Sequence, residues 1–104
     1  MTELVKLCPA DEILDGDIKL AQLPDGSEIA LYRVADTIYA TADRCTHGDA
    51  SLSEMGTLRG KIVECAFHSG TFDVTTGQPT GMPCEVPLQI YSVTLIGGYV
   101  HVEV

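Results

Sequence analysis

Two short stretches of this chain each carry a cysteine and a histidine close together, Cys45-Thr46-His47 and Cys65-Ala66-Phe67-His68. Two thiolates and two imidazoles form the donor set of a [2Fe–2S] cluster in which two histidines replace two cysteines on one iron. Structural zinc sites use the same donors, but more often pair cysteine with cysteine and histidine with histidine. The spacing therefore predicts a two-iron cluster, and a zinc site or a chance arrangement are the alternatives. The predicted ligands are Cys45, His47, Cys65 and His68.

Each stretch is expected to place its two donors on different irons. In this arrangement Cys45 and Cys65 hold the inner iron, and the two histidines hold the outer one. Gly48 and Gly70 follow the two stretches, and glycine permits tight turns that a larger residue would strain. The pattern thus predicts two ligand loops, with the histidine-bound iron nearer the surface.

Further motifs along almost the whole chain match one family of proteins. They are Tyr39-Ala40-Thr41, Cys45-Thr46-His47-Gly48, Leu52-Ser53, Glu64-Cys65, His68 with Gly70, Phe72-Asp73, Thr76-Gly77, Pro83 and Tyr91. On these motifs the chain resembles the Rieske-type [2Fe–2S] ferredoxins of bacterial multicomponent aromatic-ring-hydroxylating dioxygenases. Ala66, where many relatives have proline, and Ser69, where glycine is common, are departures that affect loop shape rather than ligand chemistry.

The resemblance implies a one-electron carrier. Such a protein passes electrons from a flavin-containing ferredoxin reductase to a terminal oxygenase through transient contacts, and it is expected to be a monomer. A third loop, from Gly77-Gln78-Pro79 to Gly81-Met82-Pro83, is implied to cover the cluster; an ordinary connecting loop is the alternative.

The resemblance also implies a low reduction potential. Respiratory relatives have a disulfide between the ligand loops, at the positions of Ala50 and Phe67, and hydroxyl donors to the cluster at the positions of Gly70 and Phe72. Because none of these side chains can supply a disulfide or a hydroxyl, the reduced cluster loses stabilising hydrogen bonds. The expected potential lies towards the lower end of the Rieske range.

The histidine count excludes an oxygenase site in the same chain. A mononuclear iron oxygenase needs two histidines and a carboxylate, whereas this chain has three histidines and the cluster takes two, leaving His101. There is also no Gly-x-Gly-x-x-Gly motif for a flavin or nicotinamide cofactor. The chain is therefore predicted to be an electron carrier and not an enzyme. A Rieske-like small subunit of a nitrite-reductase-type enzyme and a zinc-stapled binding module are the alternatives.

Composition limits the partners and the location. The formal net charge is −9 over 104 residues, which argues against nucleic acids and anionic membranes and agrees either with simple solubility or with steering towards a basic partner. No long apolar run or basic leader is visible, so a cytoplasmic location is expected. Cys8 and Cys84, outside the ligand pattern, are expected to be small buried residues.

Short aliphatic segments separated by turns predict an all-β protein. Four candidate strands precede the ligand loops, residues 4–7, 18–23, 28–34 and 37–41, and Gly97-Gly98 is predicted to join a final hairpin of 93–96 and 99–104. Ile62, Val63, Phe72 and Val74 mark strands around the second ligand loop, residues 11–14 hint at a helical turn, and His101 is expected at the surface. We predict an antiparallel sandwich or partial barrel: one domain, residues 1–104, with a base of 1–43 and 83–104 and a cluster-binding insertion of 44–82.

Overall fold

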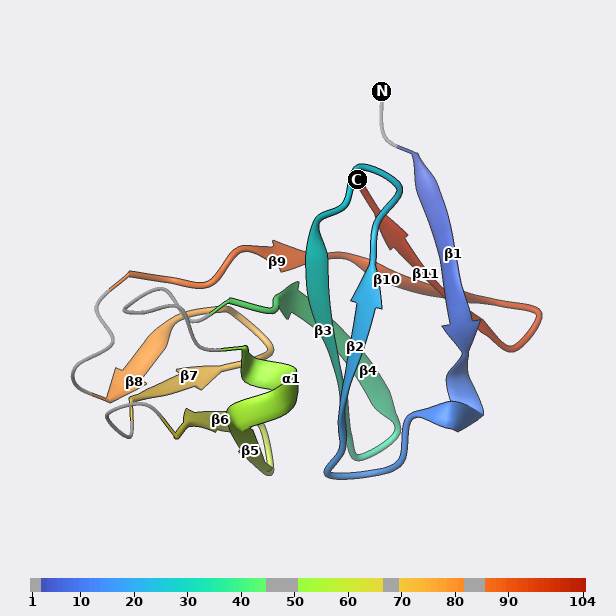
Figure 1. The fold of residues 1–104 in the computed structure, drawn as a ribbon. Helices are drawn as coiled ribbons and strands as arrows, with labels where there is room; N and C mark the ends of the chain where they lie inside the picture. The colour runs from blue at the N-terminus through green and yellow to red at the C-terminus, as the bar shows by residue number, and fades with distance from the viewer. Residues whose placement is uncertain (1–2, 45–50, 67–69, 82–85) are drawn as a thin grey trace.

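The computed structural model describes residues 3–44, 51–66, 70–81 and 86–104 and consists of three antiparallel sheets. One sheet has the order β1-β11-β10 and a second has the order β2-β3-β4-β9; the third, in order β5-β6-β7-β8, lies to one side of them together with the short helix α1 (Figure 1). The first sheet comprises β1 (Leu4–Pro9), β10 (Val93–Ile96) and β11 (Tyr99–Glu103). The second comprises β2 (Ile18–Gln22), β3 (Glu28–Val34), β4 (Thr37–Ala42) and β9 (Ile90–Tyr91). The third comprises β5 (Gly56–Arg59), β6 (Ile62–Cys65), β7 (Thr71–Asp73) and β8 (Pro79–Gly81).

Strand β3 contributes side chains to two separate apolar cores. Successive residues of a strand point to opposite faces, and all of Ile29, Ala30, Leu31 and Tyr32 are fully buried. Ile29 and Leu31 pack in the base core, which lies between the first two sheets. Ala30 and Tyr32 pack in the joint core, which β3 shares with the third sheet. The base core comprises Cys8, Ile13, Leu23, Ile29, Leu31, Ile38, Ala40, Val100 and Val102. The joint core comprises Ala30, Tyr32, Leu52, Val63, Cys65, Phe72, Val74 and Leu88.

The predicted fold class is confirmed, and the first four strands and the final hairpin are found where the sequence placed them. Gly97 and Gly98 have φ of 58° and 83°, the positive values that a tight two-residue hairpin turn requires. Val100 and Val102 are buried, as the alternation predicts, although Val104 is exposed. His101 is half-buried, and its Nδ1 lies 3.1 Å from the carbonyl oxygen of Tyr99. The helical turn is a 3₁₀ turn at Ala10–Glu12.

Three features of the third sheet differ from expectation or went unpredicted. Residues 79–81, predicted as part of a covering loop, instead form β8 and pair with β7. Pro79 begins this strand, and β8 lies at the edge of its sheet, where proline is tolerated. Strand β5 and helix α1 (Leu52–Met55) were not anticipated. The third sheet lies within the predicted insertion of 44–82, and the division into base and insertion stays a prediction.

Candidate metal centre

The first ligand segment is closed at its base by the residues on either side of it. Arg44 and Ser51 form an antiparallel β-bridge, and the Leu52 N–H donates to the Asp43 carbonyl oxygen at 2.7 Å. Cys45 and His47, two of the four predicted ligands, lie between these anchors and outside the described residues. The residues that flank the segment are therefore held together at the end of β4.

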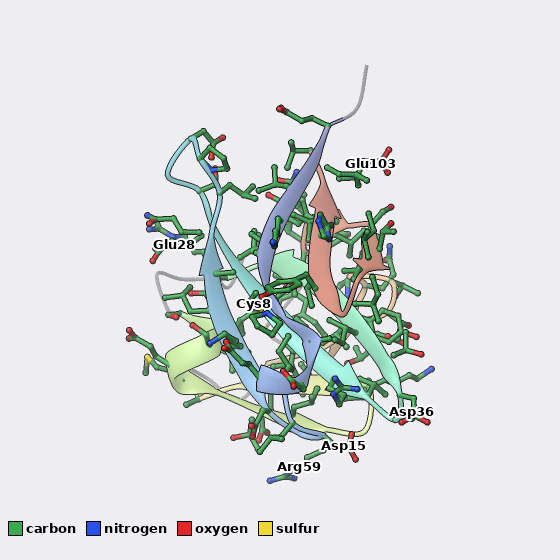
Figure 2. All side chains as sticks on the ribbon, turned by 90° about the vertical axis from the view of Figure 1, so that its right-hand side faces the viewer. Cys8, Asp15, Glu28, Asp36, Arg59 and Glu103 are labelled. Atoms are coloured by element: carbon green, nitrogen blue, oxygen red, sulfur yellow. The ribbon has the colours of Figure 1, made fainter. Side chains whose placement is uncertain are left out.

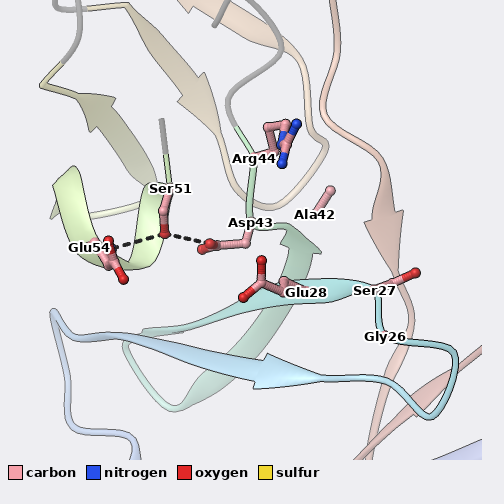
Figure 3. A pocket seen from close by; sticks show the side chains of 8 residues that line it. All are labelled: Gly26, Ser27, Glu28, Ala42, Asp43, Arg44, Ser51 and Glu54. Atoms are coloured by element: carbon pink, nitrogen blue, oxygen red, sulfur yellow. Dashed lines mark hydrogen bonds between the residues drawn. The ribbon is translucent and has the colours of Figure 1, made fainter. Parts of the chain in front are cut away.

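The side chain of Asp43 contributes to this closure. It is 4% exposed and accepts hydrogen bonds from the Ser51 hydroxyl at 2.5 Å and from the Ser53 N–H at 2.8 Å. Figure 3 shows Ser51 between Asp43 and Glu54, because the Ser51 hydroxyl also accepts from the Glu54 N–H and caps α1. Sequence reasoning missed Asp43 and Ser51, although Ser-x-x-Glu is a helix-start signal that could have located α1.

The second ligand segment begins at the end of β6. Cys65, the third predicted ligand, is fully buried in the joint core. Its N–H donates to the Gly70 carbonyl oxygen at 2.8 Å, which closes the segment that contains His68. His68 itself, the fourth predicted ligand, lies outside the described residues. The structure thus places one predicted ligand directly and the anchors of the other three.

Helix α1 joins the bases of the two ligand segments. The Met55 N–H donates to the Ser51 carbonyl oxygen at 2.8 Å, and the Ala66 N–H donates to the Met55 carbonyl oxygen at 3.1 Å. A continuous series of hydrogen bonds therefore runs from the end of the first segment to the start of the second. Two segments anchored in this way can present their donors to a common centre.

The third segment, residues 82–85, contains the predicted cover residues Met82 and Pro83, together with Cys84, and lies outside the described residues. The chain before this segment is hydrogen-bonded to the chain after it: the Gly77 carbonyl oxygen accepts from the Leu88 N–H at 2.7 Å. Gly77 has a φ of 80° at this point. The role of the segment as a cover stays a prediction.

The turn between β7 and β8 is organised by Asp73. Its carboxylate accepts from the Thr75 hydroxyl at 2.6 Å and the Thr75 N–H at 2.9 Å, and it lies 3.3 Å from the Lys61 ammonium. Burial alone would raise the pKa of Asp73, but the hydrogen bonds from Thr75 and the charge of Lys61 outweigh it, so that this pKa lies below its ordinary value. The turn that leads towards the third segment is therefore stabilised at neutral pH.

A polar pocket of about 470 Å³ lies beside the first ligand segment. Its lining comes from the β2–β3 turn, the end of β4 and α1, as Figure 3 shows. The residues are Gly26, Ser27, Glu28, Ala42, Asp43, Arg44, Ser51 and Glu54. Three acidic residues, Glu28, Asp43 and Glu54, outnumber the one basic residue, Arg44, so the pocket has an acidic character.

Cys65 has the properties that a cluster ligand requires. It is a fully buried cysteine at the end of a strand, in an apolar core that excludes water. The nearby positions 70 and 72 carry glycine and phenylalanine, respectively. Within the described ranges no group of three or more potential ligands is found, as expected when only Cys65 of the predicted set lies in them. Four donors of two soft thiolates and two imidazoles suit a two-iron cluster.

Comparison with known proteins identifies the family. Residues 3–92 match the model of the Rieske [2Fe-2S] domain. The chain is a member of the Rieske family. It is 47% identical, over all of its length and 88% of the relative's, to the ferredoxin component of the p-cumate 2,3-dioxygenase system of Pseudomonas putida.

Solved structures of Rieske proteins have the same fold. A chain in the complex of reduced oxygenase and oxidised ferredoxin in carbazole 1,9a-dioxygenase is 46% identical, with a TM-score of 0.89 over 95% of this chain and 91% of that one. The ferredoxin of Sphingomonas yanoikuyae B1 is 33% identical, with a TM-score of 0.93 over 98% and 99% of the two chains.

The family establishes the cofactor and the kind of function. This Rieske domain carries a Rieske-type [2Fe–2S] cluster, which accepts and donates one electron, and it is an electron carrier of the ferredoxin type, like the dioxygenase ferredoxin components to which it is similar. The zinc-module alternative is thereby set aside. A nitrite reductase small subunit from Mycobacterium tuberculosis has a TM-score of 0.85, but it is 21% identical and shares the fold alone.

Replacing Phe72 with tyrosine tests the predicted low potential of this Rieske domain. Phe72 is fully buried beside Cys65 in the joint core, so a hydroxyl that reaches a cluster sulfur would stabilise the more negative reduced state. We expect the potential to rise by tens of millivolts, because about 1.4 kcal/mol corresponds to about 59 mV for one electron. Protein-film voltammetry measures this shift; an unchanged potential with the fold preserved would show that the hydroxyl does not reach the cluster.

Proposed function

We propose that this chain transfers single electrons from a flavin-containing ferredoxin reductase to the terminal oxygenase of an aromatic-ring dioxygenase system in the cytoplasm. The observation that carries the proposal is the buried Cys65 at the end of β6, tied through α1 to the base of the first ligand segment. The proposed ligands are Cys45 and Cys65 on the inner iron and His47 and His68 on the outer iron. In the part of the chain that the structure describes, no helix has the length and apolarity to span a membrane.

The similarity to dioxygenase ferredoxin components supports an oxygenase as the electron acceptor. One similar chain comes from the complex of reduced oxygenase and oxidised ferredoxin in carbazole 1,9a-dioxygenase. A shuttle must also release its partner after each transfer, so we propose a small interface, below about 1,200 Å² in total. The same requirement supports a monomeric carrier that uses one surface with both partners in turn.

The acidic charge of the chain supports electrostatic steering towards the acceptor. The net charge is −9, and Glu28 and Glu54 line the pocket beside the first ligand segment. Other acidic residues lie elsewhere on the molecule: Figure 2 shows Asp15 and Asp36 at one end of the base and Glu103 towards the opposite end. A negative field of this kind would increase the rate of encounter with a basic partner.

Stopped-flow reduction of a terminal oxygenase by the reduced chain tests the proposal. We expect electron transfer, with a rate that falls as ionic strength increases from about 0.01 to 0.15 M, because the Debye length shortens from about 30 to about 8 Å. A Glu54→Gln variant, changed beside the first ligand segment, should reduce the rate at low salt more than Asp36→Asn. The second variant removes the same charge in the turn between β3 and β4. No electron transfer to any aromatic-ring oxygenase would refute the proposed acceptor, and a rate that does not change with salt would refute steering alone.

A further inference from the structure

The side chain of Asp43 has no role in the ligand set, yet it is almost completely buried beside the first ligand segment. It is 4% exposed, and burying a carboxylate is costly unless hydrogen bonds compensate for the lost water. Among the described residues, the compensation comes from the far side of the ligand segment, through the Ser51 hydroxyl and the Ser53 N–H. The carboxylate thus links the residue that precedes Arg44 to two residues that follow the ligand segment, Ser51 and Ser53.

The backbone of Asp43 adds two further connections. Its N–H donates to the Glu28 carbonyl oxygen at 3.2 Å, and its carbonyl oxygen accepts from the Leu52 N–H at 2.7 Å. Asp43 therefore contacts β3 on one side and the start of α1 on the other. Since α1 is bonded through Met55 to Ala66, a displacement at Asp43 would be transmitted to the second ligand segment as well as to the first.

We propose that Asp43 is a positioning residue of the metal centre, which fixes the ends of the first ligand segment through its carboxylate bonds to Ser51 and Ser53 and thereby sets the geometry of the bound cluster. The inference rests on the proposed ligation by Cys45 and His47. Groups that hold the ligands of a metal, without touching the metal, commonly change its affinity about 10- to 100-fold when they are removed.

Four substitutions in the holoprotein separate the bonds involved. Asp43→Ala removes both carboxylate bonds, Asp43→Asn keeps an acceptor of nearly the same shape, and Ser51→Ala removes one donor. Ser53→Ala is the control, because the bond from residue 53 to Asp43 comes from its peptide N–H and survives the change. It removes only the hydroxyl of Ser53, which lies 3.0 Å from the Ser51 hydroxyl and does not contact the carboxylate. The readouts are the rate of cluster loss in the presence of an iron chelator, the EPR g-values of the reduced protein and the reduction potential.

We expect Asp43→Ala to lose its cluster about tenfold faster or more, with altered g-values and potential. Ser51→Ala should change the same readouts in the same direction by a smaller amount, Asp43→Asn should recover most of the wild-type behaviour, and Ser53→Ala should resemble the wild type. An Asp43→Ala protein with the wild-type rate and g-values would overturn the inference.

General destabilisation is controlled by a substitution in the base core. Ile13 is buried there and is absent from the joint core, so Ile13→Val should lower the thermal midpoint without altering g-values or potential. If Asp43→Ala changes only the thermal midpoint, as Ile13→Val does, Asp43 is merely structural and the inference fails. Failure of the proposed ligation is seen separately, as a wild-type protein without the EPR signal of mixed sulfur and nitrogen ligation.

Discussion

A Cys65→Ala variant is expected to be isolated without a cluster, and therefore colourless. Cys65 is the one predicted ligand that the described part of the chain includes, and its thiol lies in the fully buried joint core at the end of β6. Alanine cannot coordinate iron, and three remaining donors cannot complete a site in which each iron takes two protein ligands. Visible absorbance and the EPR signal of the reduced protein should both disappear.

Cys8 offers a matched control for this experiment. It is also a buried cysteine, but it packs in the base core on β1, where Figure 2 labels it. Burial raises the pKa of the Cys8 thiol, an effect that Lys19 only partly opposes, so Cys8 remains a neutral thiol and a poor ligand. Cys8→Ala should keep full colour at a modest cost in stability. A coloured Cys65→Ala protein with a normal EPR signal would refute the ligand assignment.

A Gly77→Ala variant is expected to be markedly less stable than the wild-type chain. Gly77 has φ of 80°, where an L-residue costs roughly 1–2 kcal/mol. An added Cβ would also strike the Leu88 carbonyl oxygen and come within 2.9 Å of Ile90 Cγ2. Relieving such an overlap in a packed site costs roughly a further 1–3 kcal/mol. The free energy of unfolding should therefore fall by the sum of both costs.

A comparison with Gly16→Ala separates the cost of the steric overlap from the cost of the backbone conformation. Gly16 has a φ of 86°, and an added Cβ would meet nothing within 4 Å, so Gly16→Ala carries the backbone cost without the overlap. Thermal unfolding followed by circular dichroism at one scan rate should give a clearly lower midpoint for Gly77→Ala than for Gly16→Ala. Equal midpoints would show that residues 88–90 move aside without penalty.

Strands with strong periodicity were predictable from the sequence, whereas short strands held by their neighbours were not. The alternation in residues 99–104 and the Gly97-Gly98 turn predict β11 and its hairpin directly, because both are local properties. Strands β5 and β8 have no such pattern: Gly56 begins the first, and Pro79 begins the second. Both residues disfavour strands locally, so β5 and β8 must be stabilised by their pairing with the neighbouring strands β6 and β7.

The ligand pattern was readable because metal chemistry demands particular residue types at short spacing. Cys65 could be named for this reason alone, and its burial in the joint core agrees with the role. Asp43 could not be named in this way, since an aspartate before a loop is ordinary in sequence. Its role depends on Ser51, which reaches it only when the ligand segment folds back on its own base.

The joint core has a consequence for engineering by exchange of segments. One wall of it comes from β3, through Ala30 and Tyr32, and the opposite wall comes from the third sheet, including Val63 and Phe72. A peptide of residues 44–82 made alone would expose half of an apolar interface to water, and it should not fold or retain iron. A chimaera that receives this segment from another carrier would need a matching β3, so side chains that do not bind iron decide which donors and recipients are compatible.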